Sequence, residues 1–169
     1  MEVNPDASHR SQIITPHDGL YFNVLELSIV VKAVAEGYTI YEAQVPPYFA
    51  GLPTHVHRET TEWHYILGGT LAFTLNEETS VARTGTLILV HPRVVHTFWN
   101  PAAIPATLLS GRSQPNFAEY LTQLTELLAN AGSWPSTDTT PILTLAAQYD
   151  QFLPGRKNDE VQAFSFPNM

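Results

Sequence analysis

Cysteine is absent from this sequence of 169 residues. Disulfide bonds, thiolate nucleophiles and cysteine-ligated metal sites are therefore excluded, so any bound metal must use nitrogen and oxygen ligands. Basic residues are also scarce, with eight Lys and Arg against sixteen Asp and Glu, and the formal net charge is −8. Because no basic run could neutralise a phosphate backbone, we expect no nucleic-acid partner.

Long apolar runs are missing as well. The longest, Leu27 to Ala35, is interrupted by Ser28 and Lys32. It is far shorter than the roughly 20 residues that span a bilayer, and the N-terminal segment lacks the apolar core of a signal peptide. We therefore expect a cytoplasmic protein with no membrane partner.

Short runs rich in β-branched and aromatic residues fill the middle of the chain, separated by Gly, Pro and Asn. This pattern is typical of an all-β sandwich or barrel. The segment Asp18–Val34 is expected to add one or two strands to seven others: Tyr38–Val45, Thr54–His57, Glu62–Leu67, Thr70–Leu75, Thr86–Val90, His96–Trp99 and Thr107–Leu109. Since no internal repeat is present, residues 1–169 are expected to form one domain, with a barrel over about 18–112.

After Gly111 the apolar period changes from two residues to about 3.6, which predicts helices in a C-terminal segment of about 115–153. The first helix carries an apolar stripe of Phe117, Tyr120, Leu121, Leu124, Leu127, Leu128 and Ala131. A second, shorter helix is predicted from Pro141 to about Tyr149, with Thr140 as its N-cap and Pro at the first position.

Three histidines and one glutamate form the most informative pattern. His55 and His57 are two residues apart on a predicted strand, so their side chains share one face. A turn then brings Glu62 back on the next strand, and His96 lies on a later strand. Three neutral imidazoles and a carboxylate suit one divalent transition metal per chain, which can be Fe, Ni, Mn, Co, Cu or Zn.

These four residues lie in two motifs that resemble those of the cupin superfamily. The first runs Gly, His-x-His, Glu and Gly, and is carried by Gly51, His55, His57, Glu62 and Gly69. The second runs Gly, Pro, His and Asn, and is carried by Gly85, Pro92, His96 and Asn100. The resemblance implies a double-stranded β-helix, or jelly-roll, barrel with one or two C-terminal helices.

The second motif departs from the cupin pattern just before its histidine. Cupins usually have Pro five residues and Gly three residues before it, whereas this chain has His91 and Arg93 there. Gly often supplies a backbone angle that Arg adopts only at a cost, so we expect the turn before His96 to differ in shape.

The runs His-Val-His-Arg-Glu and Glu-Trp-x-Tyr-Ile-Leu-x-Gly resemble single-domain quercetin-2,3-dioxygenase-like cupins more closely. This resemblance implies a metal-dependent dioxygenase that acts on a small aromatic or enolic substrate, with Glu62 as both metal ligand and catalytic base. A non-catalytic cupin that binds a metal or small molecule stays an alternative, as does a non-redox isomerase, lyase or cyclase. A roomy apolar pocket beside the metal would favour an enzyme, and a filled one would favour binding alone.

His64 follows Glu62 by two residues, so strand alternation turns it towards the same cavity. We expect it to be a second catalytic residue that contacts substrate or transfers a proton, since an unperturbed imidazole has a pKa of about 6.5. The alternative is a core histidine bonded to a backbone carbonyl. The apolar residues Phe73, Leu75, Leu87, Leu89 and Phe98 are interpreted as barrel core or, alternatively, as the lining of an aromatic-substrate pocket.

The resemblance also bears on assembly, because quercetinase-like cupins commonly pair through sheet edges and N-terminal segments. The alternating apolar stretch Leu20–Val34 is suited to such pairing. We therefore expect a homodimer.

Overall fold

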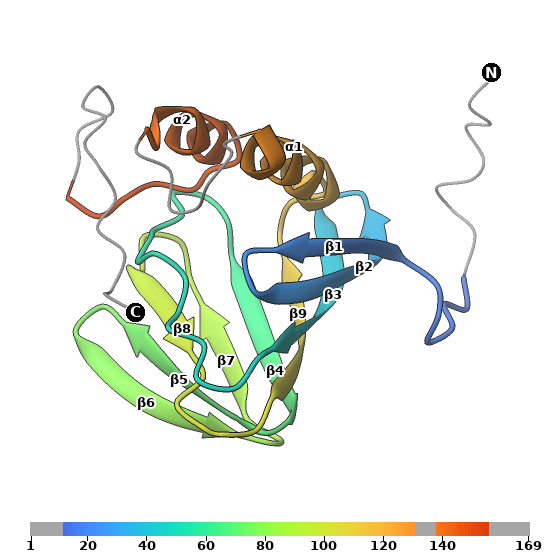
Figure 1. The fold of residues 1–169 in the computed structure, drawn as a ribbon, viewed down its shortest axis with the longest axis vertical. Helices are drawn as coiled ribbons and strands as arrows, with labels where there is room; N and C mark the ends of the chain where they lie inside the picture. The colour runs from blue at the N-terminus through green and yellow to red at the C-terminus, as the bar shows by residue number, and fades with distance from the viewer. Residues whose placement is uncertain (1–11, 131–137, 156–169) are drawn as a thin grey trace.

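Nine β-strands of the described residues form two sheets that face each other, as Figure 1 shows. The computed structural model describes residues 12–130 and 138–155, so the two ends of the expected 1–169 domain, and Ala131, lie outside it. All neighbouring strands are antiparallel. The larger sheet has the order β1 (Leu20–Val24), β2 (Leu27–Ala35), β3 (Tyr38–Val45), β9 (Ala106–Arg112), β4 (Glu62–Gly68) and β7 (Leu87–Val90). The smaller has the order β6 (Glu78–Arg83), β5 (Thr70–Leu75) and β8 (His96–Trp99).

The core lies between the sheets because side chains alternate along each strand. On β3, Thr39, Tyr41, Ala43 and Val45 are buried, whereas the residues between them are exposed or half-buried. This period-two pattern is the one on which the prediction of an all-β barrel rested, and the prediction is confirmed.

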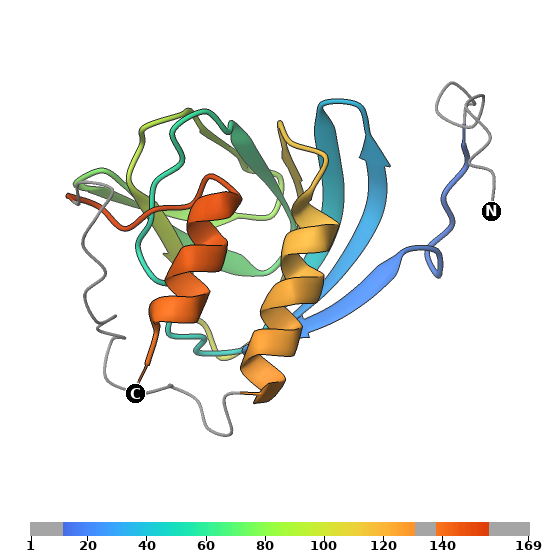
Figure 2. The ribbon, with the colours of Figure 1, turned by 90° about the horizontal axis from the view of Figure 1, so that it is seen from above.

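Two helices, α1 (Phe117–Asn130) and α2 (Thr140–Gln148), lie side by side at one end of the sheets (Figures 1 and 2). α1 buries the apolar stripe Phe117, Tyr120, Leu121 and Leu124. Both predicted helices are therefore confirmed, although Thr140 is the first residue of α2 rather than its N-cap. Neither is long and apolar enough to cross a membrane, and the same holds for every helix in the described part of the chain.

One strand was missed, and one predicted strand is wrong. β6 was missed because its residues, apart from Ala82, are exposed, so the segment has no apolar alternation. The predicted strand Thr54–His57 forms only two isolated bridges, because His55 pairs with His96 whereas Val56 pairs with Phe152. The segment therefore lies between two different partners, and Pro53 beside it has no N–H to extend a ladder.

In β7 the residues that point inward are not the ones that we expected. Leu87 and Leu89 are exposed, whereas Ile88 and Val90 are buried. The reason is the pairing with β4, which places Val90 opposite Glu62 and Ile88 opposite His64, on the inward face. Leu87 and Leu89 are thus not core residues, and they face away from the side of β4 that holds Glu62 and His64.

Candidate metal centre

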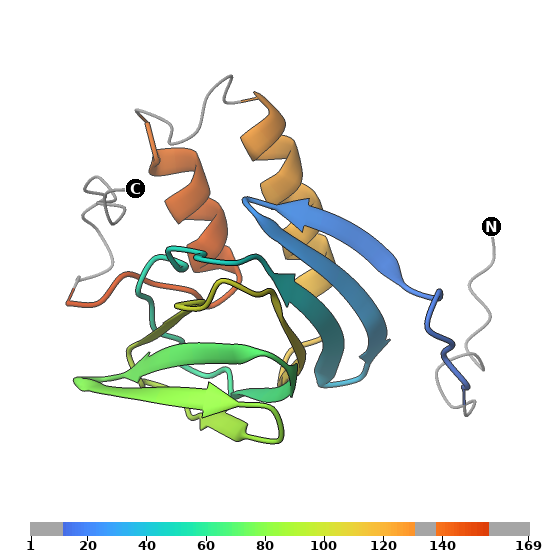
Figure 3. The ribbon, with the colours of Figure 1, turned by 60° about the horizontal axis from the view of Figure 1, so that its bottom comes forward.

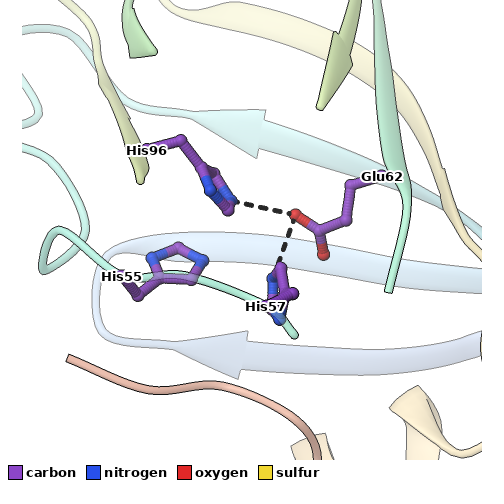
Figure 4. Close-up of side chains that lie close together, drawn as sticks. All are labelled: His55, His57, Glu62 and His96. Atoms are coloured by element: carbon purple, nitrogen blue, oxygen red, sulfur yellow. Dashed lines mark hydrogen bonds and ion pairs between the residues drawn. The ribbon is translucent and has the colours of Figure 1, made fainter. Parts of the chain in front are cut away.

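The four predicted ligand residues come together at the end of the barrel beneath the helices. His55 and His57 lie in the connection between β3 and β4, Glu62 is the first residue of β4, and His96 is the first residue of β8. All four are buried, and one nitrogen or oxygen atom of each lies within 4.8 Å of the corresponding atoms of the others. Figure 4 shows the three rings and the carboxylate turned towards one point.

Hydrogen bonds to the protein backbone orient the three imidazoles. Each Nδ1 faces a carbonyl oxygen, which only accepts, so each Nδ1 must carry the proton and donate it. The partners are Pro53 for His55 at 2.9 Å, Asp150 for His57 at 2.6 Å, and Val94 for His96 at 2.9 Å. In the neutral rings every Nε2 therefore keeps a free lone pair. This tautomer is the one that can bind a metal through Nε2.

This donor set fits a cation. The Nε2 atoms of His57 and His96 lie 3.5 Å and 3.3 Å from Oε2 of Glu62. Such spacings suit ligands held about 2.0–2.2 Å from one ion. His57 Nε2 is buried and has no hydrogen-bond partner among the described residues. Lone pairs that converge without a proton between them repel one another, so a metal ion would complete the site.

Charge states at the site agree with that reading. Burial, together with the neighbouring rings of His96 and His57, lowers the pKa of His55 to about 3. Burial alone would raise the pKa of Glu62, but the adjacent imidazoles of His57 and His96 and the Arg112 charge hold it well below its ordinary value. At neutral pH the cluster thus contains a neutral His55 ring and an ionised carboxylate, as metal ligation requires.

The region that holds this cluster is similar to known proteins. Residues 41–111 match the family model described as Cupin domain. No curated protein sequence matched the chain. The fold is that of a cupin.

Several solved structures share this cupin fold at low sequence identity. KdgF from Halomonas sp. has a TM-score of 0.55 at 14% identity, over 63% of this chain and 94% of that one. The polyketide cyclase RemF from Streptomyces resistomycificus has 0.55 at 18%, over 61% and 79%. A predicted oxalate decarboxylase from Thermotoga maritima has 0.54 at 15%, over 60% and 98%. At these identities the likeness concerns the fold alone.

Asp150 is a residue of the site that the sequence did not reveal. It follows α2, and its backbone carbonyl is the acceptor that orients His57. Its carboxylate accepts the backbone N–H groups of Arg58 and Glu59 at 3.0 Å each and that of Thr60 at 2.8 Å, and the Thr60 hydroxyl at 2.7 Å. Asp150 therefore ties the end of the helical segment to the loop that carries His57.

Arg93 occupies the place of the usual cupin glycine. Its φ of 69° lies in the left-handed region that glycine adopts freely. That the turn differs in shape from the turn of other cupins stays a prediction. The Arg93 N–H donates to the carbonyl of His57 at 2.6 Å. A non-glycine residue in this region costs about 1–2 kcal/mol, which is the cost that the sequence predicted.

Strand register explains the other polar residues near the cluster. β9 lies between β3 and β4 and places Arg112 opposite Glu62, on the same inward face. Arg112 is 3% exposed, and its Nη1 lies 3.7 Å from Oε1 of Glu62, the oxygen that faces away from His57 and His96. The predicted strand Thr107–Leu109 stopped short of Arg112, so this buried cation was missed.

His64 lies in the next inward row, which contains Tyr41, Ser110 and His64 on three neighbouring strands. His64 Nδ1 is 2.8 Å from the Ser110 hydroxyl, and its Nε2 is 3.9 Å from Glu62 Oε2. Its partner is thus a hydroxyl rather than the backbone carbonyl considered above. Burial lowers the pKa of His64 to about 4, so the ring is neutral at neutral pH, unlike the unperturbed imidazole assumed from the sequence.

A cavity of about 130 Å³ extends from the cluster to the inner face of the helices. His55, Glu62, His64 and His96 contribute to its wall, with Arg112 and Gln151 as further polar groups. Most of the remaining lining is apolar, and it comes from the β1–β2 hairpin, β3 and both helices. Figure 3 shows the β1–β2 hairpin running next to α1. Of the apolar residues weighed from the sequence, Phe98 lines this cavity, whereas Phe73 is core.

Proposed function

We propose that this chain is a metal-dependent oxygenase of the quercetinase-like kind, which acts on a small aromatic or enolic substrate. His55, His57, Glu62 and His96 hold one divalent transition metal. The metal supplies Lewis acidity, which raises the acidity of an enol or phenol oxygen at the site. The remaining work is done by residues of the chain itself.

The cavity is the observation that carries this proposal. It is open space next to three of the four ligand residues, and its wall is largely apolar. A site that served only to hold a metal would need no such space, because side chains could fill it. Its size limits the substrate, since an apolar cavity of about 150 Å³ holds one benzene molecule. The substrate is therefore a molecule with about one ring, smaller than a flavonol.

Glu62 is placed to take a proton from such a substrate. Its carboxylate is ionised, buried and part of the cavity wall. Its Oε1 lies 3.7 Å from Nη1 of Arg112, and this charge helps to orient the carboxylate. His64, 3.9 Å from Glu62, adds a neutral hydrogen-bonding group on the same wall.

The proposal is tested by metal analysis followed by oxygen uptake. Protein as purified should contain about one equivalent of a divalent metal, and a His57→Ala, His96→Ala double variant should contain almost none. Metal-loaded protein should consume oxygen with single-ring catechols or small enediols faster than with a flavonol. The matched control is His91→Ala, which removes an exposed histidine close to His96 in sequence but outside the cluster.

Three results would contradict different parts of the proposal. Equal metal content in the double variant and the wild type would remove the metal site. Metal binding with product formed in the absence of oxygen would retain the site and replace the oxygenase by a non-redox enzyme. Metal binding with no turnover of any compound would favour a binding protein.

A further inference from the structure

The cavity contains one cationic side chain, and the proposed reaction does not use it directly. Among the described lining residues, Arg112 is the only lysine or arginine and Glu62 the only acidic residue. Arg112 reaches the wall from the last position of β9, and the ring of Phe117 lies 4.8 Å from its guanidinium carbon. Its charge is therefore buried, next to apolar groups.

Within the part of the chain that the structure describes, most of the hydrogen-bonding capacity of this guanidinium is unused. A guanidinium has five N–H donors. Nη2 donates to the carbonyl of Tyr149 at a long 3.4 Å, and Nη1 lies 3.7 Å from Glu62, beyond hydrogen-bond distance. Nε has no partner among the described residues. A buried charged group with unpaired N–H donors costs free energy, and a bound acceptor would lower this cost.

The charge balance points the same way. With a divalent metal present, the cavity wall would carry the metal's two positive charges and that of Arg112, against the single negative charge of Glu62. The net excess in a buried, apolar space is two positive charges, which favours an anionic ligand. An enolate or phenolate oxygen offsets one of these charges, and a second anionic group is needed for the other.

Two phenol side chains line the same cavity as Arg112. Tyr41 and Tyr120 both line the cavity, and their rings lie 4.7 Å and 6.0 Å from that of Phe117, the ring beneath the guanidinium. Burial raises the pKa of Tyr41, and it raises that of Tyr120 to about 12, so both hydroxyls keep their protons and can donate. One cation and two neutral donors around an apolar cavity form a typical carboxylate site.

We infer that Arg112, assisted by Tyr41 and Tyr120, is the specificity-determining residue that binds a carboxylate of the substrate. The substrate is then a small apolar acid whose enol or phenol oxygen lies next to the carboxylate, as in a 2-hydroxybenzoate. The inference rests on the proposed function, because it places the neighbouring oxygen at the metal. The two oxygens of Glu62 show that the guanidinium and the histidine nitrogens lie close together, because Oε1 is 3.7 Å from the guanidinium and Oε2 is 3.3 Å from Nε2 of His96.

Calorimetric titration with two probes tests the inference. Salicylate and salicylamide have the same ring and hydroxyl and nearly the same size, but only salicylate carries a carboxylate. Both are titrated into Co²⁺-loaded and metal-free protein, and the visible spectrum of Co²⁺ reports whether the hydroxyl reaches the metal. A hydrogen-bonded ion pair in the cavity predicts that wild-type protein binds salicylate about 10- to 100-fold more tightly than salicylamide.

The Arg112→Met variant keeps an unbranched apolar stem but removes the charge. It should bind both probes with similar affinity, because the preference for salicylate depends on the guanidinium. Arg112→Gln provides a second neutral variant in case the Met variant does not fold, and circular dichroism monitors folding in both. Arg83→Met, which changes an exposed residue on β6, is the matched control and should keep the wild-type preference.

The possible results separate this inference from the proposed function. Equal affinity of wild-type protein for the two probes, or no binding of salicylate, overturns the carboxylate site. A preference that survives in the folded Arg112 variants also overturns the assignment. If Co²⁺ does not bind but metal-free protein still prefers salicylate through Arg112, the carboxylate site stands and the proposed metal function fails.

Discussion

Replacing Asp150 by alanine should destabilise the protein and weaken metal binding together. The variant loses four hydrogen bonds to the carboxylate, from the N–H groups of Arg58 and Glu59 and from the N–H and hydroxyl of Thr60. These bonds link residues about ninety positions apart, so no local structure replaces them. The two losses have different magnitudes and can be measured separately.

The stability loss follows from the burial of each donor. Arg58 and Glu59 are exposed, so water can replace the carboxylate at their amides. Thr60 is 1% exposed, and both of its donors would be left buried without a partner. At about 1–3 kcal/mol for each such donor, the free energy of unfolding should fall by about 2–6 kcal/mol. A central value of about 4 kcal/mol lowers Tm by about 8–16 °C in a chain of this size.

Metal affinity should fall because Asp150 also orients a ligand. Its backbone carbonyl accepts the Nδ1–H of His57 and is still present in the variant, but without the carboxylate nothing ties this carbonyl to the loop that carries His57. Disturbed support of a metal-ligating histidine typically costs about 10- to 100-fold in affinity. Competition with a chelator measures this change. Asp150 has a φ of 59°, where alanine is strained, so Asp150→Gly is needed to remove the carboxylate without that strain.

The pH dependence of this effect has a definite sign. Burial alone would raise the pKa of Asp150, but hydrogen bonds from Thr60, Glu59 and Arg58 outweigh it and lower the pKa. A carboxylate with a lowered folded-state pKa stabilises the protein above its unfolded pKa of about 3.9, and this stabilisation is lost as the pH falls through the folded value. The Tm difference between wild type and Asp150→Ala should therefore shrink below about pH 4.

A matched control and a clear refutation are available. Asp138 also accepts a backbone N–H, from Thr140 at 2.9 Å, but it is exposed at the start of α2 and outside the cluster. Asp138→Ala should cost less than about 1 kcal/mol and leave metal affinity unchanged. The reasoning is refuted if Asp150→Gly melts within 2 °C of wild type, or if its metal affinity equals that of Asp138→Ala.

The remaining predictions concern His64, Arg93 and assembly. His64→Phe should leave the metal content unchanged, because His64 is not one of the four ligand residues and its Nδ1 is hydrogen-bonded to Ser110. It should alter the kcat or KM of turnover, because the ring lines the cavity. Loss of the metal would rule this prediction out. The same variant should lower the free energy of unfolding by about 1 kcal/mol, since the buried Ser110 hydroxyl loses its hydrogen bond with His64 but keeps Tyr41 as a partner. Arg93→Gly should raise it by up to about 1 kcal/mol, the relief of left-handed strain less the backbone entropy of glycine, and a lower Tm would disprove this. Light scattering at micromolar concentration should give a dimer mass, and a full-length variant with charged substitutions at the exposed residues Leu20, Tyr21 and Val34 should give a monomer mass. A monomeric wild type would contradict the expected homodimer.

The ligand cluster could be predicted from the sequence because short-range geometry governs most of it. The spacing of His55 and His57 by two residues and the return of the chain to Glu62 place three side chains on one face. His96 lies on a later strand, where no local spacing ties it to the others, and its cupin motif supported its choice; in the structure all four lie together. The barrel and the two helices were predictable for a similar reason, since periods of two and about 3.6 residues reveal which face is buried.

Strand parity and edge strands were harder to predict. The run Leu87–Val90 is apolar at every position, so its composition does not show which residues point inward. Pairing with β4 decides that Ile88 and Val90 do. β6 is an edge strand that pairs with β5 alone and buries only Ala82, so it has no periodic apolar pattern to detect.

The residues around the cluster depended on the tertiary structure entirely. Arg112 faces Glu62 because β9 lies beside β4, and Asp150 reaches His57 because the chain after α2 returns to the loop between β3 and β4. Contacts of this kind join segments far apart in sequence, and no local period or motif encodes their register. By itself the sequence determined the ligand types and their shared face, through backbone geometry. Only the packing of strands and helices decided the shape of the cavity beside them, the charged Arg112 in its wall and the hydrogen bonds that hold the ligand residues in place.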